Sequence, residues 1–102
     1  MNVGSESPAA QQVFERREEI RRIAARHGAG NVRLFGSVAR GDDTEKSDVD
    51  LLLDVVGETT PWFPGGLAVE LEGMLGRRVH VVIQRSLSPL IRDSVLSEAV
   101  PL

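Results

Sequence analysis

The stretch Leu34–Leu53, LFGSVARGDDTEKSDVDLLL, decides the fold of this 102-residue chain. It contains a glycine-serine corner, Gly36-Ser37, and two aspartates, Asp48 and Asp50, which follow the serine by eleven and thirteen residues. A short strand before the corner and an alternating strand around the aspartates would set a phosphate-binding turn opposite a metal-binding pair. Either feature alone is common, and their order and spacing together indicate a site.

The two aspartates alternate with apolar residues, as on a strand with one buried face. Residues i and i+2 of a strand project from the same side with α-carbons about 6.6 Å apart, so Asp48 and Asp50 can converge on one cation. Val49 and Leu51 then point toward the core. Carboxylate oxygens on a rigid element suit magnesium, which takes its remaining ligands from water and phosphates. The pair therefore predicts Mg²⁺ and a nucleoside triphosphate such as ATP.

The glycine-serine corner supplies the complementary half of the site. Gly36 has no β-carbon, so backbone amides can approach a phosphate, and Ser37 adds a hydroxyl donor. Arg40 is either a positive group near the phosphates or the partner of an ion pair with Asp42 or Asp43. Both readings of Arg40 fit the sequence equally.

Acidic residues dominate the segment from Asp42 to Glu58, which has seven acids and one base, Lys46. This charge would repel a triphosphate without divalent cations, so nucleotide binding is expected to require metal. Ser47 either contributes to nucleotide binding by fixing the Asp48 backbone or has the structural role of beginning the strand.

The spacing Gly36-Ser37-x-Ala39-Arg40-Gly41-Asp42, four residues, then Ser47-Asp48-x-Asp50-Leu51 resembles the signature of the minimal nucleotidyltransferase (MNT) domains of the DNA polymerase β superfamily. The likeness extends through residues 66–75, 75–79 and 86–100. It implies three carboxylates that hold two magnesium ions for nucleotidyl transfer. It also implies the antitoxin of a HEPN/MNT toxin–antitoxin pair, which adenylylates a tyrosine of a HEPN-domain ribonuclease toxin.

One position departs from the family pattern. Where the third strand usually reads Val-Asp-Leu-Val, this chain has Val-His-Val-Val at 79–82. Alternation puts His80 on the cleft face with Asp48 and Asp50, so the third ligand position is an imidazole, which suits magnesium poorly. With this change the site could bind fewer than two magnesium ions. His80 is a hydrogen-bonded residue of a degenerate site, a weak metal ligand, or the proton acceptor for the attacking hydroxyl.

Asp54 shares the nominal face of Asp50, but four strand residues separate the two by about 13 Å. That distance exceeds the spacing of paired catalytic metals, which is about 3.5–4 Å. Asp54 is therefore interpreted as a strand-end residue.

The remaining pattern predicts an α/β domain with a small mixed β-sheet, helices packed on one face and an open nucleotide cleft on the other, and the resemblance implies the nucleotidyltransferase fold. Residues 1–8 are expected to be a disordered N-terminus, and residues 9–102 a single MNT domain. Ser7-Pro8 predicts the start of a helix that runs to about His27. His27 is read as a last-turn residue without function. Trp62 is expected to pack over the next helix, with an exposed protein-binding anchor as the alternative.

Composition excludes several classes of protein. The chain has no cysteine, which excludes disulfides and thiolate sites. A net charge of -3, one tryptophan and no tyrosine argue against direct nucleic-acid binding. No segment is apolar enough for a membrane span or a secretory signal, so a cytoplasmic location is expected.

These features predict a nucleotidyltransferase that moves AMP from ATP to a hydroxyl of a protein partner. Asp48 and Asp50 would hold the metals, and Gly36 and Ser37 would seat the triphosphate. The alternative is a catalytically degenerate domain that neutralises a toxin by binding alone. Modification of a small molecule is weaker, because 102 residues leave little room to enclose it.

Overall fold

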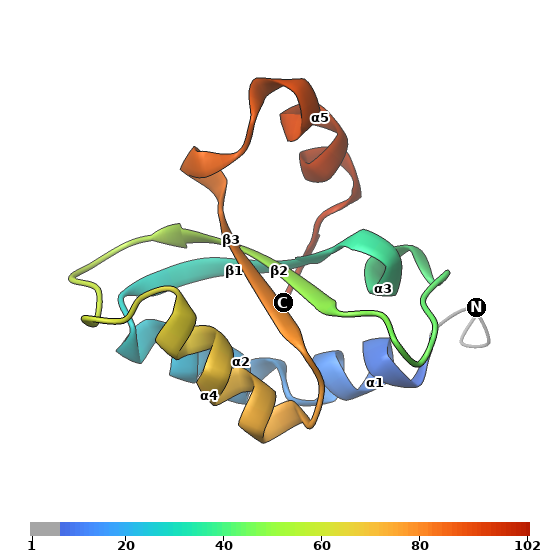
Figure 1. Ribbon diagram of the computed structural model, residues 1–102, viewed down its shortest axis with the longest axis horizontal. Helices are drawn as coiled ribbons and strands as arrows, with labels where there is room; N and C mark the ends of the chain where they lie inside the picture. Colours follow the sequence, from blue (N-terminus) through green and yellow to red (C-terminus); the bar gives the residue numbers. More distant parts are fainter. Residues whose placement is uncertain (1–6) are drawn as a thin grey trace.

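The computed structural model describes residues 7–102 as a four-stranded mixed sheet with helices around it (Figure 1). In chain order the elements are α1 (Pro8–Glu15), α2 (Arg17–Arg26), β1 (Ala29–Phe35), α3 (Gly36–Arg40), β2 (Val49–Val55), α4 (Gly65–Leu75), β3 (Val79–Ile83), a 3₁₀ turn η2 (Gln84–Ser86), α5 (Pro89–Glu98) and β4 (Val100–Pro101). No helix in this part of the chain is long and apolar enough to span a bilayer.

The sheet has the strand order β3-β2-β1-β4. β1 runs antiparallel to both β2 and β4, and β2 runs parallel to β3. Because the two parallel strands begin at the same end of the sheet, the loop before β2 and the turn before β3 lie side by side there. This arrangement confirms the predicted α/β class with a small mixed sheet.

The main core lies between the sheet and the helices α1, α2 and α4 (Figure 1). Val49, Leu51 and Leu53 of β2 are completely buried in it, as their alternation with the aspartates predicted. The last helix, α5, lies on the opposite face. It contributes Val95 to a small second cluster with Leu52. The helices are thus grouped on one face apart from α5, and the sheet end near Asp48 stays open.

The predicted helix from Ser7 to His27 is in fact two helices, because the chain turns at Arg16 (φ -107°, ψ 19°). The Arg16 guanidinium donates a hydrogen bond to the Met74 carbonyl at 2.9 Å, so the turn is fixed against the end of α4. The start of α1 is as predicted, since Ser7 caps it by accepting from the Ala10 N–H at 3.1 Å. Folded structure therefore includes Ser7 and Pro8, and residues 1–6 of the expected disordered segment lie outside the described residues.

The expected packing of Trp62 over α4 is wrong. Its side chain is 83% exposed, and the neighbouring Phe63 packs against the core instead. The local sequence does not reveal which of these two neighbouring aromatic residues turns inward. The short strand predicted before the corner is β1, which begins at Ala29 and has an irregular register against β2 between Gly30 and Arg33.

Candidate functional site

The sheet places His80, the residue at the predicted third ligand position, beside the aspartate pair. In the parallel register of β2 and β3, His80 is the direct partner of Asp50, and its Nδ1 lies 3.4 Å from Asp50 Oδ1. The His80 side chain is 64% exposed, whereas that of Asp50 is 23% exposed. The predicted parity is therefore confirmed, and His80 contributes an accessible imidazole to the cleft face.

Gly36 brings the glycine-serine corner against the aspartates. It ends the path of β1 with φ +79°, and a β-carbon added there would lie 2.2 Å from Asp50 Oδ2. Any other residue would force the Asp50 carboxylate to move, and the positive φ itself disfavours other residues, so glycine is strongly favoured beside this carboxylate. Ser37, half-buried, then begins the single turn of α3. The corner and the acidic pair are thus neighbours in space.

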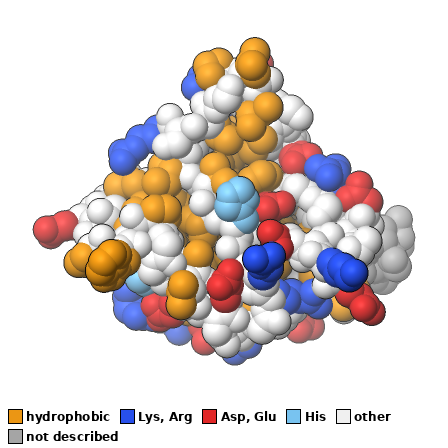
Figure 2. Space-filling view, in the orientation of Figure 1, with side chains coloured by type: hydrophobic (Ala, Val, Ile, Leu, Met, Phe, Trp, Pro, Cys, Tyr) orange, Lys and Arg blue, Asp and Glu red, His pale blue; other side chains and the backbone are white. Residues whose placement is uncertain are grey.

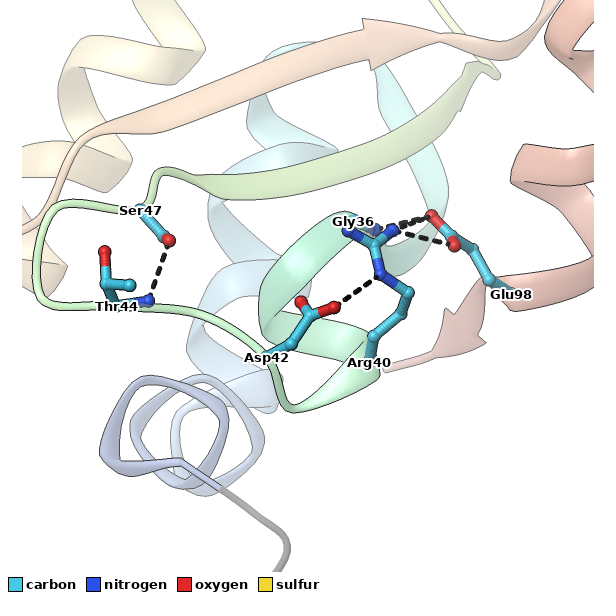
Figure 3. Close-up of polar contacts among 6 residues, drawn as sticks. All are labelled: Gly36, Arg40, Asp42, Thr44, Ser47 and Glu98. Atoms are coloured by element: carbon cyan, nitrogen blue, oxygen red, sulfur yellow. Dashed lines mark hydrogen bonds and ion pairs between the residues drawn. The ribbon is translucent and has the colours of Figure 1, made fainter.

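Glu98 lies at this corner and was not among the predicted site residues. Its Oε2 accepts the Gly36 backbone N–H at 2.8 Å, and its Oε1 accepts from Arg40 Nη1 at 3.0 Å (Figure 3). The amide and the guanidinium expected to face a phosphate therefore hold a carboxylate from the end of α5. The only signal in the sequence was the family-like ending that includes Glu98.

Arg40 also pairs with Asp42, through Nε at 3.3 Å from Oδ2 (Figure 3). The hydrogen bonds to Glu98 and then to Asp42 raise the pKa of the Arg40 guanidinium. The predicted ion pair is present with Asp42 rather than Asp43. Arg40 remains half-exposed at the rim of the corner, where it can also meet an anionic ligand.

Ser47 has the structural role foreseen for it. Its Oγ accepts the Thr44 backbone N–H at 2.9 Å and closes the turn that leads into β2 (Figure 3). This contact positions the backbone just before Asp48. Ser47 therefore acts on the site through the loop that carries the first aspartate.

The electrostatics of the acidic pair favour a bound cation. Burial raises the pKa of the Asp50 carboxyl, contact with His80 lowers it, and the charge of Asp48 raises it again. A partly buried carboxylate beside a second negative charge is costly without a cation. Asp48 and Asp50 therefore make one electrostatic unit, as their spacing predicted.

These residues fit magnesium only as an incomplete set of ligands. Among residues 7–102 there is no group of three or more His, Asp or Glu side chains arranged to hold a metal ion. Two carboxylates suit an ion that completes its coordination with water and phosphate oxygens. The His80 imidazole does not extend this oxygen set.

Two other polar residues have structural partners. Asp54 accepts hydrogen bonds from Asn31 Nδ2 at 2.9 Å and Arg33 Nη2 at 3.1 Å, in keeping with its interpretation as a residue near the end of the strand. His27 lies 2.7 Å from Thr60 Oγ1 and 2.9 Å from Glu70 Oε1. It joins the end of α2 to α4.

Comparison with known proteins agrees with this geometry. The family model described as "Nucleotidyltransferase domain" matches residues 17–102. Protein adenylyltransferase MntA of Thermococcus cleftensis is 39% identical over 80 residues, which cover 76% of this chain and 79% of that protein. A solved structure described as a candidate minimal nucleotidyltransferase is 46% identical, with a TM-score of 0.80 over 91% of this chain and 95% of that one.

A toxin–antitoxin crystal structure with AMP-PNP has the same fold, with a TM-score of 0.67 and 19% identity over 90% of this chain and 70% of that one.

Proposed function

This chain belongs to the nucleotidyltransferase domain family, and from that premise we propose that it transfers AMP from ATP to a hydroxyl of a HEPN-type ribonuclease toxin, for which it is the antitoxin. The observation that carries the proposal is the contact of Gly36 with Asp50. It brings a turn suited to phosphate next to a carboxylate of the pair suited to a cation.

The reaction is a displacement at the α-phosphorus of ATP. The acceptor oxygen forms a bond to this phosphorus while the bond to the pyrophosphate oxygen breaks, and pyrophosphate leaves. Asp48 and Asp50 would hold magnesium, which when bound would neutralise triphosphate charge and help to align the reacting groups. Gly36 N–H, the Ser37 hydroxyl and Arg40 bind the phosphates that leave.

His80 takes the proton of the acceptor hydroxyl in this proposal. Its Nδ1 faces Asp50, and its exposed ring lies at the edge strand, where an acceptor can reach it. A base oriented by a carboxylate is a common arrangement in group transfer. The loss of a third carboxylate thus removes a metal ligand and retains a proton acceptor.

Glu98 has to give up its contacts with Gly36 and Arg40 when phosphates bind, since one N–H cannot fully serve two anions. The half-buried Glu98 carboxylate is at the end of α5, a helix that buries few residues. A small shift of this helix would release the corner. ATP binding is therefore expected to compete with a contact within the protein.

A protein acceptor is supported by the relative that is named a protein adenylyltransferase. The resemblance to antitoxins supports a toxin as that acceptor.

The test is co-expression of the chain with a HEPN-type ribonuclease toxin, followed by intact mass analysis of the toxin. We expect the toxin to gain the mass of one AMP unit, and Asp48→Asn to abolish this gain. The proposal would be refuted if the toxin kept its mass after incubation with the folded native protein and ATP–Mg²⁺.

The binding-only alternative draws on the imidazole at position 80 and on Glu98. Glu98 accepts from Gly36 of the glycine-serine corner, which is called the phosphate corner below. It predicts that Asp48→Asn still neutralises the toxin in cells. Loss of neutralisation by Asp48→Asn, with the protein still bound to the toxin, would exclude this alternative.

A further inference from the structure

A cavity of about 800 Å³ adjoins Asp48 on the side away from the phosphate corner. It lies between the loop before β2, the turn before β3 and Gln12 of α1. The two parallel strands start at this end of the sheet, where the Val49 N–H donates to the Arg78 carbonyl at 2.9 Å. The cavity therefore opens directly beside the start of the strand that carries the aspartates.

Three basic side chains line this cavity, namely Lys46, Arg77 and Arg78. Within residues 7–102 none of them forms an ion pair with a carboxylate. Arg77 is held in place by donating from Nε to Gln12 Oε1 at 2.9 Å. Two acids, Glu45 and Asp48, share the lining, so the basic groups exceed the acidic ones.

Other basic residues, such as Arg22 and Arg85, also lack an ion pair within residues 7–102, but this cavity brings three such residues together in a protein whose net charge is -3. Arg16, Arg26 and Arg40 each pair with a carboxylate of the chain itself. The cavity thus collects basic groups that an anionic ligand can still use. Arginine and lysine beside each other suit carboxylates or phosphates.

The position of the cavity decides between ligands. Gly36 lies at the end of β1 and Arg78 just before β3, so the phosphate corner and the cavity flank the β2 aspartates from opposite sides. In a direct displacement the entering hydroxyl and the leaving pyrophosphate also lie on opposite sides of the phosphorus. The cavity is therefore on the acceptor side of the site.

We propose that this cavity binds an acidic segment of the acceptor protein and so holds the accepting hydroxyl at the aspartate pair. The inference rests on the proposed nucleotidyl transfer. Charge complementarity of this kind fixes register and speeds encounter. A nucleic acid fits the cavity less well, because its lining contains no aromatic side chain for stacking and includes two acids.

The first test measures binding of a fluorescein-labelled oligo-aspartate peptide by anisotropy at low salt. We expect Lys46→Gln/Arg78→Gln to weaken binding roughly tenfold or more. The matched pair Arg22→Gln/Arg85→Gln removes the same charge from elsewhere and should leave binding nearly unchanged. Both pairs exchange exposed side chains, and equal melting temperatures check that they fold.

Three results would overturn the inference. The first is that the peptide fails to bind or binds the two double variants equally. The second is that ATP–Mg²⁺ displaces the peptide, which would assign the cavity to the nucleotide. The third is that a labelled single-stranded RNA binds more tightly than the peptide and depends on the same residues.

A second readout separates this inference from the proposed function. In AMP transfer to the toxin, Lys46→Gln/Arg78→Gln should raise KM for the toxin while KM for ATP stays unchanged. If calorimetry shows that the native protein does not bind ATP–Mg²⁺, the transfer reaction fails. Peptide binding that still depends on Lys46 and Arg78 would then support the acidic docking surface alone.

Discussion

The carboxylate of Asp50 lies so close to the α-carbon of Gly36 that a β-carbon there would sit 2.2 Å from Oδ2. The φ of Gly36 is +79°, in the region that other residues rarely adopt. The close approach and the positive φ together favour glycine at this position and place the glycine-serine corner next to Asp50.

Gly36→Ala is expected to abolish AMP transfer and to lower the free energy of unfolding by about 1–3 kcal/mol from backbone strain alone. Chemical denaturation and transfer assays measure the two effects. Gly73→Ala is the control, because nothing lies within 4 Å of its added β-carbon and its φ is not positive. That variant should be stabilised by about 0.5–1 kcal/mol. A fully active Gly36→Ala would contradict the assigned role of the corner.

Asp50→Asn is expected to raise the melting temperature in the presence of a chelator, while it abolishes transfer. Burial raises the pKa of this carboxyl, so the folded state disfavours its charge. The free-energy cost of this charge in the folded state is full above the raised pKa and is lost as pH falls through it toward the ordinary pKa. The gain in melting temperature from Asp50→Asn should therefore shrink in acid. Asp54→Asn should instead lower the melting temperature, since Asp54 accepts from Asn31 and Arg33. A less stable Asp50→Asn would disprove this account.

His80→Asn is expected to lower the rate of transfer by about 10²-fold or more, because an amide cannot take the proton of the hydroxyl. Single-turnover kinetics with saturating ATP measures this step. His80→Asp provides the comparison, since it restores a third carboxylate and should tighten Mg²⁺ binding. If His80→Asn retains the native rate, His80 is not the proton acceptor.

Glu98→Ala is expected to tighten ATP–Mg²⁺ binding roughly tenfold, the worth of one charge-assisted hydrogen bond. The substitution frees the Gly36 N–H and Arg40, which Glu98 occupies. Calorimetry measures the affinity. Asp93→Ala removes an exposed acid from the same helix and serves as the control. Weaker binding by Glu98→Ala would mean that Glu98 supports the corner rather than competing for it.

Glu70→Gln is expected to lower the melting temperature near neutral pH. The hydrogen bond with His27, and then that with Arg26, lowers the pKa of Glu70. A carboxyl with a lowered pKa stabilises the fold above its ordinary pKa, and this contribution is lost as pH falls through the folded value. The difference from the native protein should therefore vanish in acid. Glu58→Gln, at an exposed acid without an ion pair in residues 7–102, should have little effect at any pH.

Local patterns were enough to predict the face of β2 that carries Asp50, with Asp48 immediately before the strand. Alternation has a period of two, so burying Val49, Leu51 and Leu53 leaves the aspartates on the other side. The same parity identified His80 as a member of the cleft face, and reach along a strand excluded Asp54. Each of these inferences uses only the alternation of side chains within one strand, or the same alternation in two neighbouring strands.

Contacts between distant segments could not be predicted in this way. Glu98 reaches Gly36 across 62 positions of sequence, and no local period indicates which acid of the last helix does so. The turn at Arg16 between α1 and α2 is held by a hydrogen bond to a carbonyl of α4, a partner 58 positions away in sequence. In the same way, Phe63 rather than Trp62 packs against the core.

The sequence by itself determined the residue types of the site and the face on which the strand presents them, because side-chain direction follows from local backbone geometry. Tertiary structure alone decided that Glu98 holds the phosphate corner and that Lys46 and Arg78 share a cavity beside Asp48. The parallel pairing of β2 and β3 brings their two preceding loops to the same end of the sheet, and that proximity depends on how the whole chain packs.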